Sequence, residues 1–388
     1  MAGTFPFLPD AQVSAAGFPT RLHGFSAIDS YLGRDASNAV HLLCGADPSD
    51  LARLFEGLRY PGASLADAAL DLGEKTWYFR CEDEPGDPHR PSFGFLGFYL
   101  DCKTRRFHDP NGVYPLLRGI KGGADAGGAG EALRNPDPRT DPCRALMDGA
   151  MILARYFPGT GAREANAAAE GFPRGAPPGK EEQRLLLAEL LGVPHPAPGF
   201  EFLKRGGFVA EHWPELAEMD GVDHSKEFHP EGNVWRHTME TLRYRKAGTG
   251  GRFDLRLSLG LLLHDVGKPL SRSASHRRFD GHAELGETRA RRFLERLGFD
   301  AALVRDVCYL VRNHMLPAAL PRLPLFRTSE KMASPLFPLL MELYRCDESS
   351  SFKGLDGYYQ SSAAYRSYLR HRRNPYRSED GKKILTFR

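Results

Sequence analysis

Histidines and aspartates recur in the C-terminal half of the sequence at spacings that could build a metal site. Each lies on or at the end of a different run with helical periodicity, and the facing helices of a bundle can direct such side chains into one core. Imidazole and carboxylate ligands together favour a divalent ion such as Mn, Fe, Co, Ni or Zn over Ca. The predicted ligands are His237, His264, Asp265, His282, His314 and Asp347.

The adjacent pair His264 and Asp265 is the most informative of these positions. It ends the apolar run SLGLLL, and Gly267 follows closely. A charge and an imidazole beside an apolar core are costly unless they are paired or bound to a metal. The alternative is a helix C-terminal cap with a surface aspartate, which the other four positions disfavour. Lys268 either takes part in the chemistry of this site or is a solvated lysine near a helix C-terminus.

Helices must supply the elements that carry these side chains. From about residue 183 the sequence shows helical periodicity and is expected to be nearly all α. Asn233 is the expected N-cap of the helix that carries His237. The predicted helices span 181–191, 234–246, 253–267, 282–298, 301–315 and 334–346.

The N-terminal part has a different pattern. Short apolar runs at 39–44, 75–81 and 93–102 alternate with a predicted helix at 48–58, which indicates a mixed α/β unit. Gly-rich and Pro-rich segments after it are typical of loops or linkers. We therefore expect a head at 1–120, a linker at 121–140, a helical neck at 141–222 with a loop at 158–180, a metal-binding helical unit at 223–350 and a basic tail at 351–388.

The composition is that of a globular protein of 388 residues, with 41% hydrophobic and 26% charged residues. No run of about 18 apolar residues indicates a membrane helix, and no secretory signal is recognisable. Six cysteines form no CxxC pair, so reduced thiols are expected. The net charge of +3 conceals an asymmetry, because residues 366–388 carry +6 and the remainder −3. We expect a cytoplasmic protein with no membrane partner; the sequence does not indicate its oligomeric state.

The motifs resemble a known family. The order H…HD…H…H…D, with HDVGK at its centre, resembles the HD superfamily of metal-dependent phosphohydrolases. The run 198–242, with its GF..L...G, PEL and HPEGNVW.HT elements, resembles the junction before the HD domain in bacterial CCA-adding tRNA nucleotidyltransferases and their poly(A) polymerase relatives. This resemblance implies a multidomain α+β fold: an α/β nucleotidyltransferase-like head, a helical neck and an all-α HD bundle.

The resemblance also implies roles for the candidate residues. Asp265 and Lys268 would act in catalysis, with one or two divalent ions (Mn, Fe, Co, Ni or Mg) as cofactor. One ion would be held by His237, His264, Asp265 and Asp347, while His282 and His314 would complete a second site or bind phosphate.

The head departs from the family pattern where nucleotidyl transfer needs acids. Two carboxylates one residue apart on a strand would hold two Mg ions on a triphosphate, but the family's D-x-D aligns with Ala-Val-His at 39–41. The Gly-Gly-x-x-R phosphate loop is reduced to Gly-Arg-Asp at 33–35, and two further motifs have lost polar residues. These losses predict a degenerate head.

The basic tail interleaves arginines with aromatic residues. Single-stranded nucleic acid is bound by such a combination of charge and stacking. The alternative is an amphipathic helix whose tyrosines pack on the bundle and whose arginines are solvated. The candidate RNA-binding residues are Arg366, Arg370, Arg372, Arg373 and Arg377.

The resemblance, together with the candidate metal ligands and the departures in the head, implies a metal-dependent phosphohydrolase with an inactive nucleotidyltransferase-like head. It would act on a phosphomonoester or 2′,3′-cyclic phosphate of a nucleotide or an RNA 3′ end, with tRNA as a possible partner. One alternative is a CCA-adding enzyme or poly(A) polymerase whose active-site carboxylates are unrecognised. Another is a non-enzymatic RNA-binding or scaffold protein with a structural metal.

Overall fold

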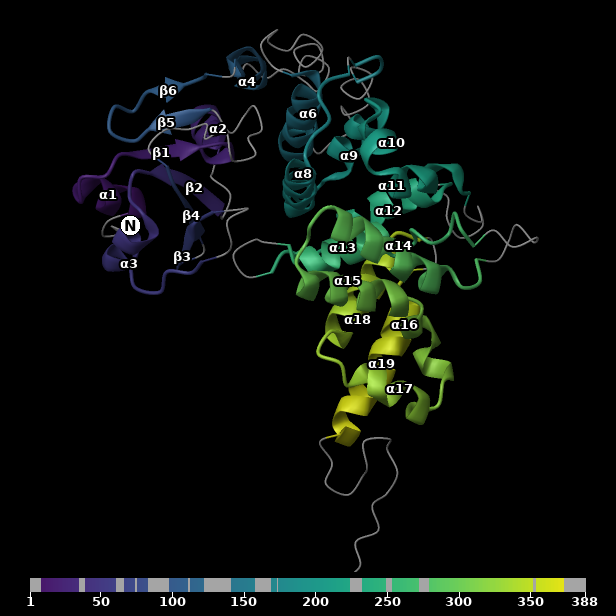
Figure 1. The fold of residues 1–388 in the computed structure, drawn as a ribbon. Helices are drawn as coiled ribbons and strands as arrows, with labels where there is room; N and C mark the ends of the chain where they lie inside the picture. Colours follow the sequence, from purple (N-terminus) through teal and green to yellow (C-terminus); the bar gives the residue numbers. More distant parts are fainter. Residues whose placement is uncertain are drawn as a thin grey trace, which may run out of the picture. The chain divides into compact units, whose positions relative to one another are not determined.

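Short strands of the N-terminal part form one mixed sheet (Figure 1). They are β1 (Thr20–His23), β2 (Ala39–Cys44), β3 (Ala68–Leu72), β4 (Lys75–Cys81), β5 (Tyr99–Asp101) and β6 (Phe107–His108). The order across the sheet is β3-β4-β2-β1-β5-β6. Strands β2 and β4 are parallel, with Cys44 opposite Cys81, and the other neighbouring pairs are antiparallel.

The structure is a computed structural model. It describes residues 8–34, 39–60, 66–73, 75–82, 98–110, 112–121, 141–157, 169–172, 174–223, 232–248, 253–271, 279–351 and 354–372. These residues fall into two compact units, one drawn mainly from Met1–Val193 and the other from Val209–Lys246 and Phe253–Arg388. The 121–140 linker and the 158–180 loop lie largely outside the described residues.

One face of the sheet carries an apolar core. Side chains of α1 (Pro9–Ala15) and α3 (Pro48–Leu54) pack there against alternate residues of β2 and β4. Helix α3 starts as expected, because Asp47 caps it by accepting hydrogen bonds from the backbone amides of Ser49 and Asp50. The expected span of 48–58 is too long. Phe55 adopts an extended conformation and is buried in this core, so the helix ends at Leu54.

The expected strand at 93–102 is described only in part. Its residues 93–97 lie outside the described part of the chain, and β5 covers 99–101. Gly33, the first residue of the expected phosphate-loop remnant, has a left-handed conformation and caps the C-terminus of α2 (Phe25–Leu32).

A buried ion pair joins this sheet layer to the first helix of the neck. Asp29 on α2 accepts hydrogen bonds from Arg155 at 2.5 Å and from the Tyr156 hydroxyl at 2.7 Å. Both donors lie at the end of α6 (Pro142–Tyr156). The Asp29 side chain is only 3% exposed, and removing one partner of such a pair leaves an uncompensated buried charge. Helix α4 (Tyr114–Lys121) precedes α6 in the chain, and α8 (Lys180–Gly192) and α9 (Ala197–Arg205) follow it.

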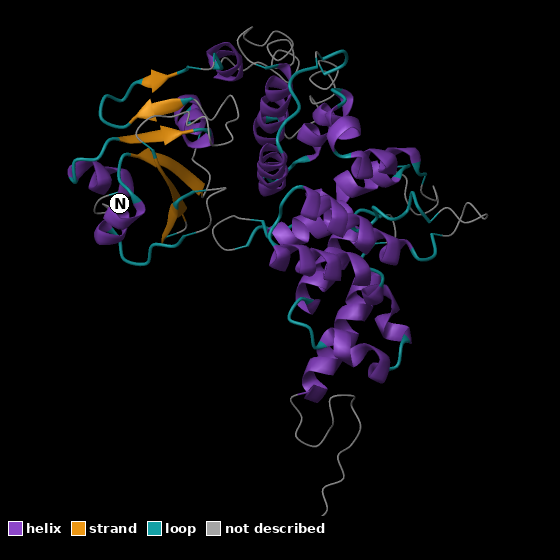
Figure 2. Ribbon diagram, in the orientation of Figure 1, coloured by secondary structure: helices purple, strands orange, loops and turns teal. Residues whose placement is uncertain are grey.

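The second unit is helical (Figure 2). None of the described helices is both long and apolar enough to cross a membrane. The main helices are α12 (Val234–Arg243), α13 (Leu255–Leu263), α14 (His282–Arg296), α15 (Ala301–Asn313), α18 (Phe337–Ser349) and α19 (Asp356–Arg372). Shorter elements are α10 (Phe208–His212), α11 (Pro214–Ala217), η2 (Glu218–Gly221), α16 (Leu316–Ala319), η4 (Leu320–Arg322) and α17 (Leu325–Met332). The sheet head and the helical C-terminal bundle confirm the predicted α+β class.

Helix α12 begins where the sequence predicts. The side chain of Asn233 accepts a hydrogen bond from the backbone amide of Arg236, which satisfies one of the free amides of the first turn. The N-cap therefore fixes the start of the helix that carries His237.

A close backbone approach sets the position of α14. A Cβ atom on Gly267 would overlap the backbone carbonyl oxygen of His282 and the backbone of Gly286. Glycine at 267 thus lets the turn after His264 and Asp265 pack directly against the start of α14, which carries His282.

We predict that Gly267→Ala destabilises the helical unit by about 1–3 kcal/mol, because the added methyl overpacks two backbones. Thermal unfolding followed by tryptophan fluorescence measures this. In a Trp77→Phe background, the remaining tryptophans, Trp213 and Trp235, both lie in the helical unit. Gly221→Ala is the control, since nothing lies within 4 Å of its added Cβ. Equal melting temperatures for the two variants would contradict the prediction.

Candidate metal centre

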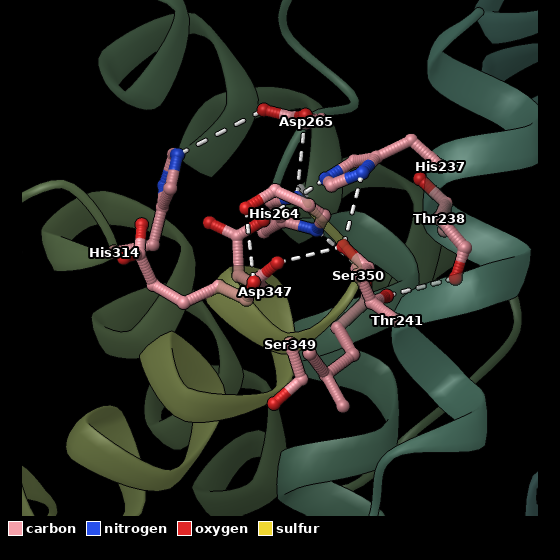
Figure 3. A network of polar contacts seen from close by, with 12 residues as sticks. His237, Thr238, Thr241, His264, Asp265, His314, Asp347, Ser349 and Ser350 are labelled. Carbon is pink, nitrogen blue, oxygen red and sulfur yellow. Dashed lines mark hydrogen bonds and ion pairs between the residues drawn. The ribbon is translucent and has the colours of Figure 1, made fainter. Parts of the chain in front are cut away.

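The six predicted ligands lie together in the helical unit. Figure 3 labels five of them, His237, His264, Asp265, His314 and Asp347. Every side chain among them except that of Asp347, which is 25% exposed, is at least about nine-tenths buried. His237 lies within α12, His264 caps α13 and precedes Asp265, His282 begins α14, His314 caps α15, and Asp347 lies in α18.

Asp265 is at the centre of the cluster. Its Oδ2 atom lies 3.2 Å from Nε2 of His264, and its Oδ1 atom lies 3.5 Å from Nε2 of His282 and 3.8 Å from Nε2 of His314. Nε2 of His237 lies 3.0 Å from Oδ1 of Asp347. Two groups that could each hold an ion share the central carboxylate: His237, His264 and Asp265, and Asp265, His282 and His314.

Three imidazoles are oriented by the backbone. The Nδ1 atoms of His264, His282 and His314 lie 2.7–2.8 Å from the carbonyl oxygen three residues earlier in the chain. A carbonyl only accepts a hydrogen bond, so each Nδ1 carries the proton. In the neutral ring, Nε2 then presents a lone pair to the centre of the cluster.

These lone pairs are unsatisfied without a cation. The Nε2 atoms of His282 and His314 face each other at 3.0 Å, and Nε2 of His264 makes no hydrogen bond among the described residues. Protonation does not satisfy these nitrogens near neutral pH, because burial lowers the pKa of His282 and lowers the pKa of His314 to about 3. Neutral imidazole nitrogens beside a carboxylate are the donor set that a divalent metal prefers. The residues therefore fit a metal ion.

The spacing of the ligand atoms also fits. Two donors about 2.1 Å from one ion lie about 3.0 Å apart when they subtend a right angle. The His237–Asp347 separation has this length. Burial alone would raise the pKa of Asp347, but the hydrogen bond and charge of His237 hold that pKa well below its usual range. The carboxylate is thus ionised and able to bind metal.

The cluster opens into a pocket of about 600 Å³. The Lys268 ammonium lies in it, but bonds Oδ2 of Asp265 at 2.6 Å and is 13% exposed. A catalytic role for Lys268 remains a prediction. In the structure its ammonium contacts the candidate metal ligand Asp265. Sequence reasoning missed Arg312 and Tyr344, which also line the pocket. The sequence could have indicated them by their spacing, because Arg312 precedes His314 by two residues and Tyr344 precedes Asp347 by three.

The tail helix α19 packs by its tyrosines. Tyr368 is buried, and the Tyr365 ring lies 4.7 Å from that of Phe337. The side chains of Arg366 and Arg370 are exposed. This is the arrangement of the amphipathic-helix alternative, although exposed arginines could still contact RNA. Arg372 is also exposed, whereas Arg373 and Arg377 lie outside the described residues.

In the sheet, a histidine occupies the place expected for a catalytic carboxylate. His41 on β2 stacks on Tyr78 with ring centroids 5.2 Å apart, and the ring of His23 meets it edge-on at 5.8 Å. Burial, then the charges of Arg155 and Arg80, lower the pKa of His41 to about 4. The His41 ring is therefore uncharged near neutral pH, and the charged groups that act on it, Arg155 and Arg80, are positive.

Comparison with known proteins identifies the helical unit and its relatives. Residues 234–348 match the family model described as HD domain. The chain is 36% identical over 142 residues to the CC-adding tRNA nucleotidyltransferase of Thermus thermophilus, covering 36% of this chain and 32% of the relative. It is 38% identical over 130 residues to the multifunctional CCA protein of Halorhodospira halophila, covering 33% and 30%.

One further relative and one solved structure are also similar to this chain. The A-adding tRNA nucleotidyltransferase of Deinococcus radiodurans is 32% identical over 190 residues, or 46% of this chain and 43% of the relative. The crystal structure of the Bacillus stearothermophilus CCA-adding enzyme in complex with CTP aligns at 16% identity and a TM-score of 0.41, over 93% of this chain and 80% of that one. The matches span about a third of the length of the first curated relatives.

The chain therefore contains an HD domain and is related to the CCA-adding tRNA nucleotidyltransferases. These relatives contradict the expected function of a phosphohydrolase with an inactive head, and they favour the nucleotidyltransferase alternative. The expectation failed because it assigned the chemistry of a metal-binding bundle to the whole chain. It also took the loss of polar residues at four motifs of the head, the acids at 39–41 among them, to exclude nucleotidyl transfer.

We predict that His264→Gln abolishes metal-dependent stabilisation of the helical unit, because the buried Nε2 of His264 faces Oδ2 of Asp265 at 3.2 Å and belongs to one of the two groups that could hold an ion. In wild-type protein, Mn²⁺ or Co²⁺ at 100 times its dissociation constant should add about 2.7 kcal/mol. Elemental analysis and the Trp213 and Trp235 melting curve measure the effect. His212→Gln, on α10 and outside the pocket, should behave as wild type. A variant at 264 that keeps the full metal content would refute this assignment.

The low pKa of His41 predicts a pH dependence of the stability of the sheet. The unfolded histidine binds a proton near pH 6.5, whereas the folded one does so only near pH 4. The contribution of His41 to the free energy of unfolding should therefore fall as the pH is lowered through this window, by at most about 1.4 kcal/mol per unit. The neighbouring His23, whose pKa burial also lowers, adds to this decline. Hydrogen exchange of β4 in guanidinium measures it. His41→Gln should show a shallower decline, and identical slopes would exclude the histidine as the cause.

Proposed function

We propose that this protein adds nucleotides to the 3′ end of tRNA and that its helical unit binds a divalent metal. Sequence similarity to a CC-adding enzyme, an A-adding enzyme and a multifunctional CCA protein is the observation that carries the proposal. The mixed sheet with its neck is compatible with a transferase head, and the tRNA and nucleotide partners follow from the same relatives. A cytoplasmic location is part of this proposal.

The described strands do not themselves offer a site for the two metal ions of nucleotidyl transfer. Their acids are Asp71 on β3 and Asp101 on β5, and three strands separate them. Asp71 is bonded to Arg59 and Thr76, and Asp101 accepts a hydrogen bond from the Thr104 amide. No acidic pair on these six strands fits the ions, so no catalytic step is assigned to them. Nucleotide addition needs acids from outside the six strands.

In the helical unit, a divalent ion bound by the His/Asp cluster would act as a Lewis acid toward a phosphoryl oxygen. The cationic side chains of Lys268 and Arg312 lie in the same pocket. Arg312 pairs with Glu284, whose exposed fraction is 56%. Asp280, Glu284 and Glu348 also line the pocket, so a phosphate-bearing ligand such as a nucleotide or an RNA 3′ end would be held mainly by the bound ion. The candidate ligands are His237, His264, Asp265, His282, His314 and Asp347.

The exposed arginines of α19 would add electrostatic affinity for RNA. Because Tyr365 and Tyr368 pack inward, we assign Arg366 and Arg370 to phosphate contacts rather than to a stacking platform. Such contacts make binding depend on salt and little on sequence.

The function is tested with three tRNA transcripts. The first ends at the discriminator base, the second ends in CC and the third ends in the complete CCA. Each is incubated with the protein, Mg²⁺ and labelled CTP or ATP. We predict incorporation into one or both shortened transcripts and none into the complete one. The absence of incorporation into both shortened transcripts would overturn the proposal.

A matched variant excludes a contaminating host enzyme. Asp29→Ala leaves the buried charge of Arg155 without its carboxylate, which costs about 3–5 kcal/mol, so incorporation should be lost. Metal binding by the helical unit should persist in this variant. His212→Gln should retain both properties. Undiminished incorporation by the Asp29 variant would indicate that another protein is responsible.

A further inference from the structure

One imidazole of the metal cluster is oriented differently from the other three. His264, His282 and His314 each use a backbone carbonyl at Nδ1. Nδ1 of His237 instead lies 3.3 Å from the hydroxyl oxygen of Ser350, the residue that caps α18 (Figure 3). A side chain from another helix end, 113 residues away, thus meets this ring.

The direction of this hydrogen bond follows from the second contact of the serine. The Ser350 hydroxyl donates to the backbone carbonyl of Asp347 at 2.6 Å. Its single proton is used there, so its oxygen accepts the proton of His237 Nδ1. Nε2 is left to face the Asp347 carboxylate at 3.0 Å. The serine therefore contacts both residues of this ligand pair, one through its ring and the other through its backbone.

We infer that Ser350 is a positioning residue for the metal centre. Its hydroxyl fixes the ring of His237 on α12 in the orientation that directs Nε2 to the ion, and ties that ring to the turn that carries Asp347. The inference rests on the proposed metal site of the helical unit and is independent of nucleotide addition. Partners that orient a metal-bound histidine typically change metal affinity about 10–100-fold when removed.

The same helix end supplies a matched control. The Ser349 hydroxyl donates to the carbonyl of Arg345 at 2.7 Å, as the Ser350 hydroxyl does to that of Asp347. Both serines are partly buried. Substituting either by alanine removes one local hydrogen bond from the end of α18, but only the substitution at 350 removes the contact with His237.

The experiment titrates metal-free, full-length protein with Co²⁺, followed by its visible absorption, and with Mn²⁺, followed by calorimetry. We predict that Ser350→Ala binds about 10–100-fold more weakly than wild type, with an altered Co²⁺ spectrum. Ser350→Thr, which keeps the hydroxyl, and Ser349→Ala should both remain within about threefold of wild type. The metal-free melting temperatures of the two alanine variants should agree, which separates positioning from general destabilisation.

Two results would overturn the inference alone: Ser350→Ala binding Co²⁺ and Mn²⁺ as tightly as Ser349→Ala, or Ser350→Thr binding as weakly as Ser350→Ala. Failure of the wild-type protein to bind either ion would instead overturn the proposed metal site, and the inference with it. Neither result depends on the incorporation of nucleotides into tRNA, so these titrations and the test of nucleotide addition can fail independently.

Discussion

The helical unit depends on one electrostatic constraint, which is that several electron pairs are directed at a common buried point. The carboxylate of Asp265 faces three imidazole nitrogens, and two of these nitrogens face each other at 3.0 Å. Backbone carbonyls hold the opposite ring nitrogens protonated, so the rings cannot turn their lone pairs away without losing a buried hydrogen bond. Divalent cations bound in the two groups that share Asp265 would satisfy these electron pairs. The helix ends that carry these groups and the pocket beside them are arranged around that requirement.

The local geometry of helix ends meets this constraint. His264 and His314 follow the last residues of α13 and α15, and His282 is the first residue of α14. At such positions the carbonyl three residues earlier is close to the ring of the histidine, so one short hydrogen bond fixes its orientation. Gly267 then allows the turn after Asp265 to meet the start of α14. The ligands are therefore oriented largely by backbone atoms, which no side-chain substitution removes.

The sequence allowed much of this unit to be predicted, because helical periodicity and the order of His and Asp residues are local signals. The candidate ligand set and the N-cap at Asn233 required only neighbouring residues, whereas the helix expected at 253–267 is shorter in the structure, because α13 ends at Leu263. Ser350 could not be found in this way, since its partner His237 lies on another helix and serines are common at helix ends. The length of α3 was overestimated because burial of Phe55 in the sheet core is a tertiary effect. The functional error had a different origin: a motif describes the chemistry of one unit, and the relatives of the chain showed which activity the whole is related to.

Placing ligands at helix ends also determines which parts of the chain can change length. An inserted residue within α13 or α15 would rotate the terminal histidine by about 100° and move it by about 1.5 Å, which removes it from the cluster. An insertion between two ligand-bearing helices does neither, because each end is held by its own packing. Descendants of this sequence can therefore vary the connections while the helix lengths stay fixed, and a partner or substrate can be accommodated by changing loops that never touch the ion.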